Sequence, residues 1–247
     1  MRRRLLVCGI PASGKTYCLK GLKDHEKVLF LNCEPSKGMD LPFKNKFIKK
    51  LITNPVGQIM GENSYLTQAG KSPDQISTIV IDSLTFLMDM YETLYVNTAP
   101  AKDKFNVWGA YSDFFKNLLE QKLSTLPQDV IFTAHVADKF DELAGSMDTR
   151  VPVKGNVGKK GAEAYFNNIV YTKRVKLKEL EKYQNDLLHI TETDEMLGFK
   201  HVIQTRLTKD TINEKIRSSD DMWDVKETYI DGNVQLVLDR MNEYYGD

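Results

Sequence analysis

Short apolar runs alternate with longer amphipathic segments along the chain, and this alternation predicts an α/β fold. Four runs are almost wholly apolar, as expected for strands buried on both faces of a parallel sheet: 4–9, 27–33, 77–82 and 129–135. Two more alternate between apolar and polar residues and indicate strands nearer a sheet edge: 167–175 and 200–208.

Between these runs, a helical spacing of apolar residues predicts helices at 15–25, 84–95 and 105–125. The third has a stripe that we expect to face the core: Phe105, Trp108, Tyr111, Phe115, Leu118, Leu119 and Leu123. A closing helix is expected near the end of the chain, beginning close to Asp231 or Asn233. Three polar segments are predicted to be loops: 35–75, 96–104 and 137–161. The last is long for a compact domain, which is typical of a functional or mobile loop.

The overall composition indicates an ordinary globular protein, which we expect to form a single domain over residues 1–247. Lys and Arg together number 34, and so do Asp and Glu, which disfavours a uniformly basic nucleic-acid binder but allows a local basic groove. The three cysteines have no disulfide or zinc spacing and are predicted to be reduced core thiols. No stretch has the length of a membrane span, and we expect a cytoplasmic protein with no membrane partner.

The segment "GIPASGKT", residues 9–16, matches the phosphate-binding pattern G-x-x-x-x-G-K-[ST]. A predicted strand precedes it and a predicted helix follows it, so that backbone N–H groups can converge on phosphate oxygens. Lys15 would reach the β- and γ-phosphates, and the Thr16 hydroxyl would bind Mg²⁺. The nucleotide-binding residues expected from this loop are Gly9, Pro11, Ala12, Ser13, Gly14, Lys15, Thr16 and Tyr17.

Three polar residues follow other predicted strands and complete a candidate site. Asp82 ends the strand "STIVID" and is the expected Mg²⁺ ligand. Because Ser83 follows Asp82, a base that activates water must come from elsewhere, and Glu34 lies just past the second strand. His135 ends the fourth apolar strand, where it can touch the γ-phosphate. Parallel strands share one carboxyl edge, so these residues are expected to converge on a hydrolysis site.

At these residues the chain resembles the RecA-like ATPase core, and in particular phage-encoded nucleotide-binding proteins of the Sak-type single-strand-annealing group. The resemblance covers most of residues 1–220 and is carried by "GIPASGKT", "IVIDSLTFL", "NVWGAYSDFF", "LPQDVIFTAHV" and "EKIRSS". It implies a mostly parallel sheet flanked by helices, ATP and Mg²⁺ as cofactors, and a role in phage DNA recombination, strand annealing or replication.

The same resemblance implies a homo-oligomer, either a ring or a filament, with nucleotide sites between subunits. The Lys-x-Arg pair of such proteins reaches into the neighbour's site, and Lys215 and Arg217 match it in the segment 209–247. A single-strand-binding protein or another replication protein is a further implied partner. The alternative for Lys215 and Arg217 is an exposed, charged helix or turn.

A single-stranded DNA surface is also implied by the resemblance, in the loop that follows His135. Its basic residues would neutralise phosphates: Arg150, Lys154, Lys159 and Lys160. The first half of that loop is acidic. A second candidate is "FKNKFIKK", residues 43–50, where two Phe side chains among lysines would stack on bases or else belong to an amphipathic surface helix. The charged segment 176–198 receives no role.

Three other functions stay open. A nucleoside or small-molecule kinase uses a similar phosphate loop, but residues 96–160 contain a single arginine, Arg150, where a kinase lid needs several cations. A nucleotide-dependent assembly or loader module would keep Lys15 and Asp82 and hydrolyse negligibly. A ring helicase motor would need a partner for its missing hub or primase domain. No N-K-x-D guanine-reading motif is present, which favours ATP.

Overall fold

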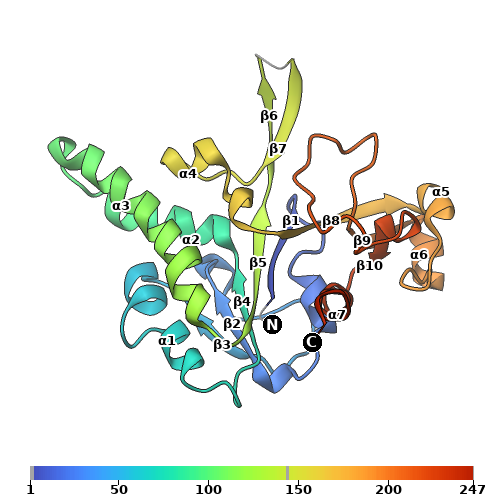
Figure 1. Cartoon of the computed structure of the whole chain (residues 1–247), viewed down its shortest axis with the longest axis horizontal. Coiled ribbons are helices and arrows are strands. Elements are labelled where there is room, and N and C mark those ends of the chain that lie inside the picture. Colours follow the sequence, from blue (N-terminus) through green and yellow to red (C-terminus); the bar gives the residue numbers. More distant parts are fainter. Residues whose placement is uncertain (1–2, 143–144, 247) are drawn as a thin grey trace.

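The computed structural model describes residues 3–142 and 145–246, which form an α/β fold around one large sheet (Figure 1). Within these residues the main sheet has the spatial strand order β10-β9-β8-β1-β5-β4-β2-β3, and β6 pairs with β7 in a separate hairpin. The strands are β1 (Arg4–Gly9), β2 (Val28–Asn32), β3 (Ile48–Leu51), β4 (Thr78–Asp82), β5 (Asp129–His135), β6 (Ala137–Asp141), β7 (Ser146–Arg150), β8 (Asn168–Lys176), β9 (Phe199–Gln204) and β10 (Tyr229–Asp231). The predicted fold class is confirmed.

The strand order brings the polar strand ends together. β1 lies between β5 and β8, and β4 lies between β5 and β2, all in parallel. The register places His135 beside Gly9 and Asp82 beside Asn32 as Cα partners. At the other side of the sheet, β9 and β10 run antiparallel to their neighbours. The carboxyl edge of the parallel strands is therefore where a site can form.

Helices cover both faces of the sheet. The α-helices are α1 (Tyr65–Gly70), α2 (Leu84–Tyr91), α3 (Lys104–Lys116), α4 (Gly155–Lys160), α5 (Leu177–Leu180), α6 (Glu192–Leu197) and α7 (Val234–Tyr245). Alternate residues of β1 enter two separate cores: Leu6 and Cys8 pack with α2 and α3, whereas Leu5 and Val7 pack with α7. This two-sided burial is why the central strands are continuous apolar runs.

The predicted second, third and closing helices are present. α2 continues into a π-helical turn over Glu92–Val96, and α3 continues through Asn117–Lys122. α7 begins after Asn233, whose side-chain oxygen accepts a hydrogen bond from the backbone N–H of Gln235 (2.9 Å). This cap satisfies one N–H group that the first helical turn leaves without an intrahelical partner.

The helix predicted over 15–25 is wrong in length. A 3₁₀ helix over Tyr17–Gly21 lies there, and the chain turns away at Leu22 and at Asp24, which has a left-handed φ of 47° and precedes a second 3₁₀ turn over His25–Lys27. α7 packs directly on this short helix. Space is so tight that a Cβ at Gly21 would overlap the side-chain amide of Asn233. A contact from the far end of the chain thus limits a helix that local periodicity favours.

One member of the predicted aromatic stripe is not in the core. Tyr111 and Phe115 are buried, but Phe105 is 90% exposed. Phe105 is the second residue of α3, and the start of that helix extends past the sheet at the left of Figure 1. The helical spacing correctly predicts the buried face of α3, but it does not predict how far the rest of the fold extends beneath that helix.

Three segments that were predicted to be loops or received no role contain regular structure. Segment 35–75 holds the edge strand β3 and α1, and 137–161 forms the β6–β7 hairpin and α4. The hairpin projects from the top of the molecule in Figure 1. The charged segment 176–198, which received no role from the sequence, forms the short helices α5 and α6. These strands were missed because they are short and polar, so neither apolar runs nor helical spacing marks them.

The three cysteines, Cys8, Cys18 and Cys33, are free thiols in the core. Burial raises the pKa of each thiol above its usual value, because the interior solvates a thiolate poorly. They are therefore protonated, packed side chains rather than reactive groups.

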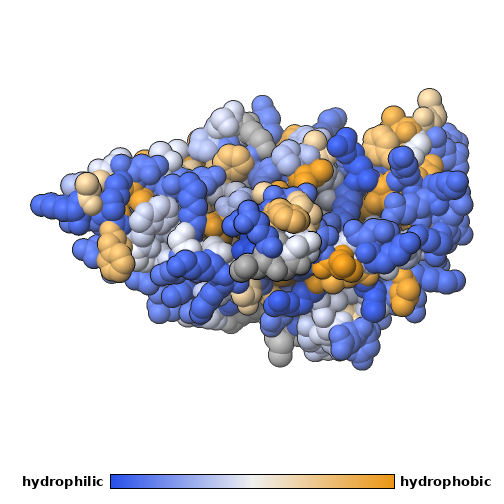
Figure 2. Space-filling view, turned by 90° about the horizontal axis from the view of Figure 1, so that it is seen from above, coloured by the Kyte–Doolittle hydropathy of each residue, from blue (hydrophilic) through white to orange (hydrophobic). Residues whose placement is uncertain are grey.

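The surface is mostly hydrophilic, and larger hydrophobic side chains gather at a few places (Figure 2). The most exposed include Phe105 on α3, Phe140 on the hairpin, and Met196 and Leu197 at the end of α6. Of the helices in the described part of the chain, none combines the length and the hydropathy that crossing a membrane requires.

The contact between Gly21 and the α7 cap predicts opposite effects of alanine at two glycines. Gly21→Ala should lower the free energy of unfolding by about 1–2 kcal/mol, because the new methyl group displaces the capping side chain of Asn233. Gly109→Ala is the matched control: it lies on α3 with open space around it and should raise stability by up to about 1 kcal/mol. Urea unfolding of the full chain measures both, and equal effects would contradict the tight contact.

Candidate nucleotide-binding site

The phosphate loop follows β1 and closes around the side chain of Lys15. Left-handed φ angles at Ala12 (60°) and Gly14 (103°) curl the backbone, and glycine is the residue that adopts the second without strain. Lys15 is buried, and its Nζ donates hydrogen bonds to the carbonyl oxygens of Gly9 (2.9 Å) and Ile10 (2.8 Å). The backbone N–H of Cys18 then donates to Gly14 (2.8 Å), which starts the first turn.

The loop is tied to the centre of the sheet through Asp82. The Thr16 hydroxyl donates to Asp82 Oδ2 (3.0 Å), and the Thr133 hydroxyl donates to Asp82 Oδ1. Asp82 is buried, and hydrogen bonds from hydroxyl groups offset part of the cost of removing its carboxylate from water. Sequence reasoning missed Thr133, although a polar residue inside the apolar strand "VIFTAH" is a signal for such a contact.

Thr16 and Asp82 supply the donor set that Mg²⁺ prefers. A hydroxyl and a carboxylate oxygen lie within hydrogen-bond distance of each other at the mouth of the loop, and Mg²⁺ takes oxygen ligands with the remaining positions filled by water and phosphate oxygens. Among the described residues, no cluster of three or more His, Cys, Asp or Glu side chains could hold a metal by itself. The residues therefore fit a metal that arrives with a nucleotide.

Glu34 and His135 meet across the end of β4. Their Oε1 and Nε2 atoms are 3.6 Å apart, and the Glu34 side chain is only 4% exposed. The backbone around Glu34 is held by Asn32, whose side-chain oxygen accepts from the Glu34 N–H (2.7 Å). Asn32 was also missed, although it is a polar residue at the end of an apolar strand, as Asp82 and His135 are.

The first turn of α2 fixes the position of His135. The Thr85 hydroxyl accepts a hydrogen bond from the His135 backbone N–H (3.0 Å), and the Phe86 ring contacts the imidazole edge to face, with ring centres 5.5 Å apart. α2 itself starts directly after Asp82, with Ser83 as its N-cap. Asp82, the candidate metal ligand, and His135, the candidate contact of the γ-phosphate, are therefore connected by the short segment 82–86.

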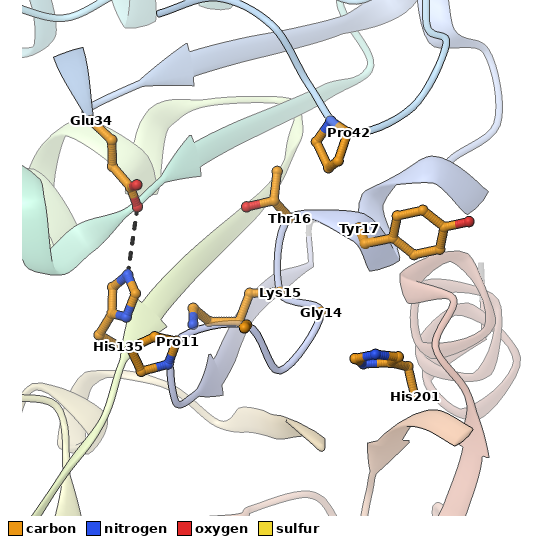
Figure 3. A pocket seen from close by; sticks show the side chains of 10 residues that line it. Pro11, Gly14, Lys15, Thr16, Tyr17, Glu34, Pro42, His135 and His201 are labelled. Carbon is orange, nitrogen blue, oxygen red and sulfur yellow. Dashed lines mark ion pairs between the residues drawn. The ribbon is translucent and has the colours of Figure 1, made fainter. Parts of the chain in front are cut away.

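Lys15, Thr16, Glu34 and His135 line one cavity of about 450 Å³, a size typical of small-molecule sites. Asp82 is not one of its lining residues and is joined to it through Thr16. In Figure 3 the side chains of Glu34 and His135 point toward each other at one end, and Tyr17 and His201 lie at the other, with Lys15 and Thr16 between them. The residues of the predicted loop that line the cavity are Pro11, Ala12, Gly14, Lys15, Thr16 and Tyr17. Gly9 and Ser13 instead line a smaller cavity of about 280 Å³, beside β8.

His201, on β9, was not found from the sequence. Its Nδ1 lies 3.1 Å from the carbonyl oxygen of Ser13, and because a carbonyl oxygen only accepts, Nδ1 carries the proton in this contact. Thr172 on β8 braces the same residue, with its hydroxyl 2.7 Å from Ser13 Oγ. Both contacts require β8 and β9 to pass behind the loop, which no local pattern shows.

Lys215 and Arg217 do not line this cavity. Lys215 Nζ forms an ion pair with Asp148 on the hairpin (2.6 Å), and Arg217 Nη1 donates to the carbonyl of Phe166 (3.4 Å). The Arg217 backbone pairs with Ile169 in β8, and its side chain is largely exposed. The segment is an irregular loop beside the hairpin, so neither side chain serves the site of its own chain.

The four basic candidates for DNA contact differ in their surroundings. Arg150 forms an ion pair with Asp148, and Lys154 forms one with Glu92 (2.8 Å). Lys159 and Lys160, in the last turn of α4, are exposed and have no ion pair with another described residue. The amphipathic surface helix considered as the alternative for segment 43–50 is absent, and Phe47 is buried against Phe30 and Phe43. Phe47 is a core residue, and the stacking role considered for it is wrong.

Comparison with known proteins places this geometry in a family. A family model described as an AAA domain matches residues 1–206, a span that includes the phosphate loop, Glu34, Asp82 and His135 and excludes Lys215 and Arg217. No match was found among curated proteins. Because the match covers most of the chain, and because Asp82 accepts a hydrogen bond from Thr16 of the phosphate loop, the chain belongs to the AAA domain family of P-loop, nucleotide-binding ATPases.

Proposed function

We propose that the chain is a Mg²⁺-dependent ATPase that binds single-stranded DNA, works as a ring or filament, and acts in phage recombination, strand annealing or replication. The observation that carries the hydrolytic part is the meeting of the phosphate loop and the Glu34–His135 pair at one cavity, with Asp82 joined to that loop through Thr16. The Thr16–Asp82 pair would bind the metal, and the Glu34–His135 pair would act on the attacking water.

The two ends of the cavity are lined by different residues, and this difference would orient the nucleotide. The phosphates would lie over the loop, with Lys15 and Mg²⁺ on Thr16 and Asp82 at their oxygens. The γ-phosphate would point to Glu34 and His135, and the base would lie between Tyr17, Pro42 and His201 at the other end. Tyr17 is 46% exposed and offers a ring face that stacks on any base, so the preference for adenine rests on the absence of a guanine-reading motif.

Glu34 is the candidate general base. Its side chain is only 4% exposed, and its Oε1 lies 3.6 Å from Nε2 of His135. Water held between Glu34 and the γ-phosphate would lose its proton to Glu34 as it attacks. His135 would detect the change when the γ-phosphate leaves, since the imidazole contacts both the base and the cavity.

The β6–β7 hairpin is the candidate DNA-contacting element. It begins at Ala137, two residues after His135, and the backbone N–H of Val136 donates to Gly9 (3.3 Å), which links the hairpin to both sides of the nucleotide site. Phe140 and Met147 face each other in the hairpin register and are 57% and 44% exposed. With Lys159 and Lys160 on α4, they offer stacking and charge without sequence readout.

Two other functions are less well supported. A kinase would clamp its transferring phosphate with several cations, but Arg150, the single arginine of 96–160, is bound to Asp148, and no arginine lines the nucleotide cavity in the described residues. A non-hydrolysing loader would use Lys15 and Asp82 but would not need Glu34. The burial of Glu34 beside His135 favours hydrolysis.

The first test is the rate of ATP hydrolysis with and without single-stranded DNA. Single-stranded DNA should stimulate turnover by the parent chain, and Lys15→Ala should lower turnover by about 100-fold or more, because the charge over the phosphates is lost. Lys27→Ala, at an exposed lysine outside the cavity, is the matched control and should hydrolyse like the parent. A Lys15→Ala chain that keeps full turnover contradicts the assignment of the site.

The second test separates hydrolysis from binding. Glu34→Gln keeps the size of the side chain but removes the base, and it should lower turnover about 10²–10⁴-fold while nucleotide affinity changes little. Binding of a fluorescent ATP analogue and steady-state phosphate release measure the two effects. Glu26→Gln, at an exposed site, is the control. Unchanged turnover in Glu34→Gln would move the loader reading ahead.

The third test asks whether Arg217 acts on a neighbouring subunit. Arg217→Ala and Lys15→Ala should each hydrolyse poorly alone, since one lacks the cation from its neighbour and the other lacks its own phosphate ligand. Mixed in equal amounts, about a quarter of the sites combine an intact Lys15 with an intact Arg217, so activity should return in part. Lys209→Ala mixed with Lys15→Ala is the control for dilution. No recovery on mixing would contradict the role of Arg217 in a neighbour's site.

A further inference from the structure

A groove at one end of the molecule combines an apolar floor with acidic walls. It has a volume of about 610 Å³ and lies over α5 and the chain leading to α6, with Leu177, Leu180 and Leu188 on its floor. Glu181, Asp186 and Glu195 line it, and no lysine or arginine does so among the described residues. Figure 1 shows α5 and α6 at the right-hand end of the molecule, where Figure 2 shows hydrophobic side chains gathered.

The three carboxylates of this groove, which we call the acidic groove, have no partner within the described chain. Glu181, Asp186 and Glu195 are exposed and form no ion pair there. Nearby, Met196 is 88% exposed and Leu197 is 58% exposed. A surface with leucine side chains and only acidic residues among its charged lining fits a partner with apolar and basic side chains side by side.

The opposite edge of the sheet carries that complementary chemistry. In the extended segment that ends in β3, every second residue is exposed: Lys44, Lys46, Ile48 and Lys50. None of the three lysines forms an ion pair with another described residue. Among the strands of the described residues, β3 pairs with β2 alone and is the last strand of the sheet on that side. We call this surface the basic edge.

Repulsion between lysines limits how two copies of the chain can meet at the basic edge. An open strand edge invites pairing, but two basic edges facing each other would bring their lysines together, and lysine on an edge strand opposes such pairing. An acidic surface relieves this repulsion. The acidic groove and the basic edge lie at opposite sides of the same sheet, so one copy can use both at once.

We propose that the acidic groove of one copy receives the basic edge of the next, head to tail. Such a heterologous contact repeats from copy to copy and gives a ring if the rotation closes or a filament if it does not. This deepens the oligomer of the proposed function, and it rests on that function only in needing a second copy of the chain.

The position of the basic edge joins assembly to the nucleotide. Pro42 lines the nucleotide cavity directly before this segment, and the ring of Phe43 contacts the ring of Tyr17, with centres 6.2 Å apart. A neighbour bound at the basic edge would therefore press on one wall of the cavity. Bound nucleotide is expected to strengthen assembly for the same reason, because the coupling between two sites is reciprocal.

Charge reversal on each surface tests the proposal. The edge variant carries Lys44→Glu, Lys46→Glu and Lys50→Glu, and the groove variant carries Glu181→Lys, Asp186→Lys and Glu195→Lys. Sedimentation velocity of the full chain with ATP and Mg²⁺ at low salt should show assembly weakened at least about tenfold for each variant alone. An equimolar mixture should assemble again, because each contact in an alternating chain then joins opposite charges. High salt should weaken the parent assembly.

A control variant has the same change in net charge as the edge variant, but at other positions: Lys71→Glu, Lys102→Glu and Lys209→Glu. These three lysines are exposed and lie in neither of the two surfaces, so this variant should assemble like the parent. Circular dichroism and binding of a fluorescent ATP analogue show that each variant is folded, independently of hydrolysis. The proposal is overturned if folded variants fail to assemble on mixing, if the control triple disrupts assembly equally, or if the parent is a monomer under all conditions. It is also overturned if the edge variant loses binding to single-stranded DNA but assembles normally. Absence of hydrolysis in an assembling parent would count against the proposed function alone.

Discussion

Two hydroxyl groups that donate to one buried carboxylate hold the functional end of this molecule together. Thr16 comes from the phosphate loop, Thr133 from the middle of β5, and both bind Asp82 at the end of β4. A carboxylate this deep would be costly without such partners, so the three strands must keep their relative positions for the loop to keep its shape. The same carboxylate is also the candidate metal ligand, so one group would serve both the stability of this end of the fold and the chemistry of the site.

From this centre, rigid connections lead outward in two directions. α2 starts directly after Asp82 and holds His135 through Thr85 and Phe86, and the β6–β7 hairpin leaves the sheet two residues beyond His135. On the other side, β8 and β9 brace the loop through Thr172 and His201. A change at the γ-phosphate therefore has a short, continuous path to the projecting hairpin and a separate one to the elements at the far end of the sheet.

The two ends of the sheet differ in charge although the whole chain is balanced at 34 cations and 34 anions. Neutrality overall removes long-range repulsion between copies, and the separation of charge leaves each copy with a basic side and an acidic side. The acidic side is built by 176–198, a segment whose sequence alone suggested no role. Its significance depends on where the chain carries it, beside β9 and away from the basic edge at β3.

The sequence by itself determined the fold class, the central strands, the phosphate loop and the polar residues at the strand ends. These are local signals: apolar runs report strands buried on both faces, and a parallel sheet places their carboxyl ends at one edge. Only the tertiary structure decided that the helix after the loop stops at Gly21, where α7 packs against it, and that Phe105 extends beyond the core. Only the tertiary structure brought His201 and Thr172 to the loop and placed Lys215 and Arg217 away from it. These contacts join residues that are far apart in the chain. Local periodicity predicts which face of an element is buried, but it does not predict which other element covers that face.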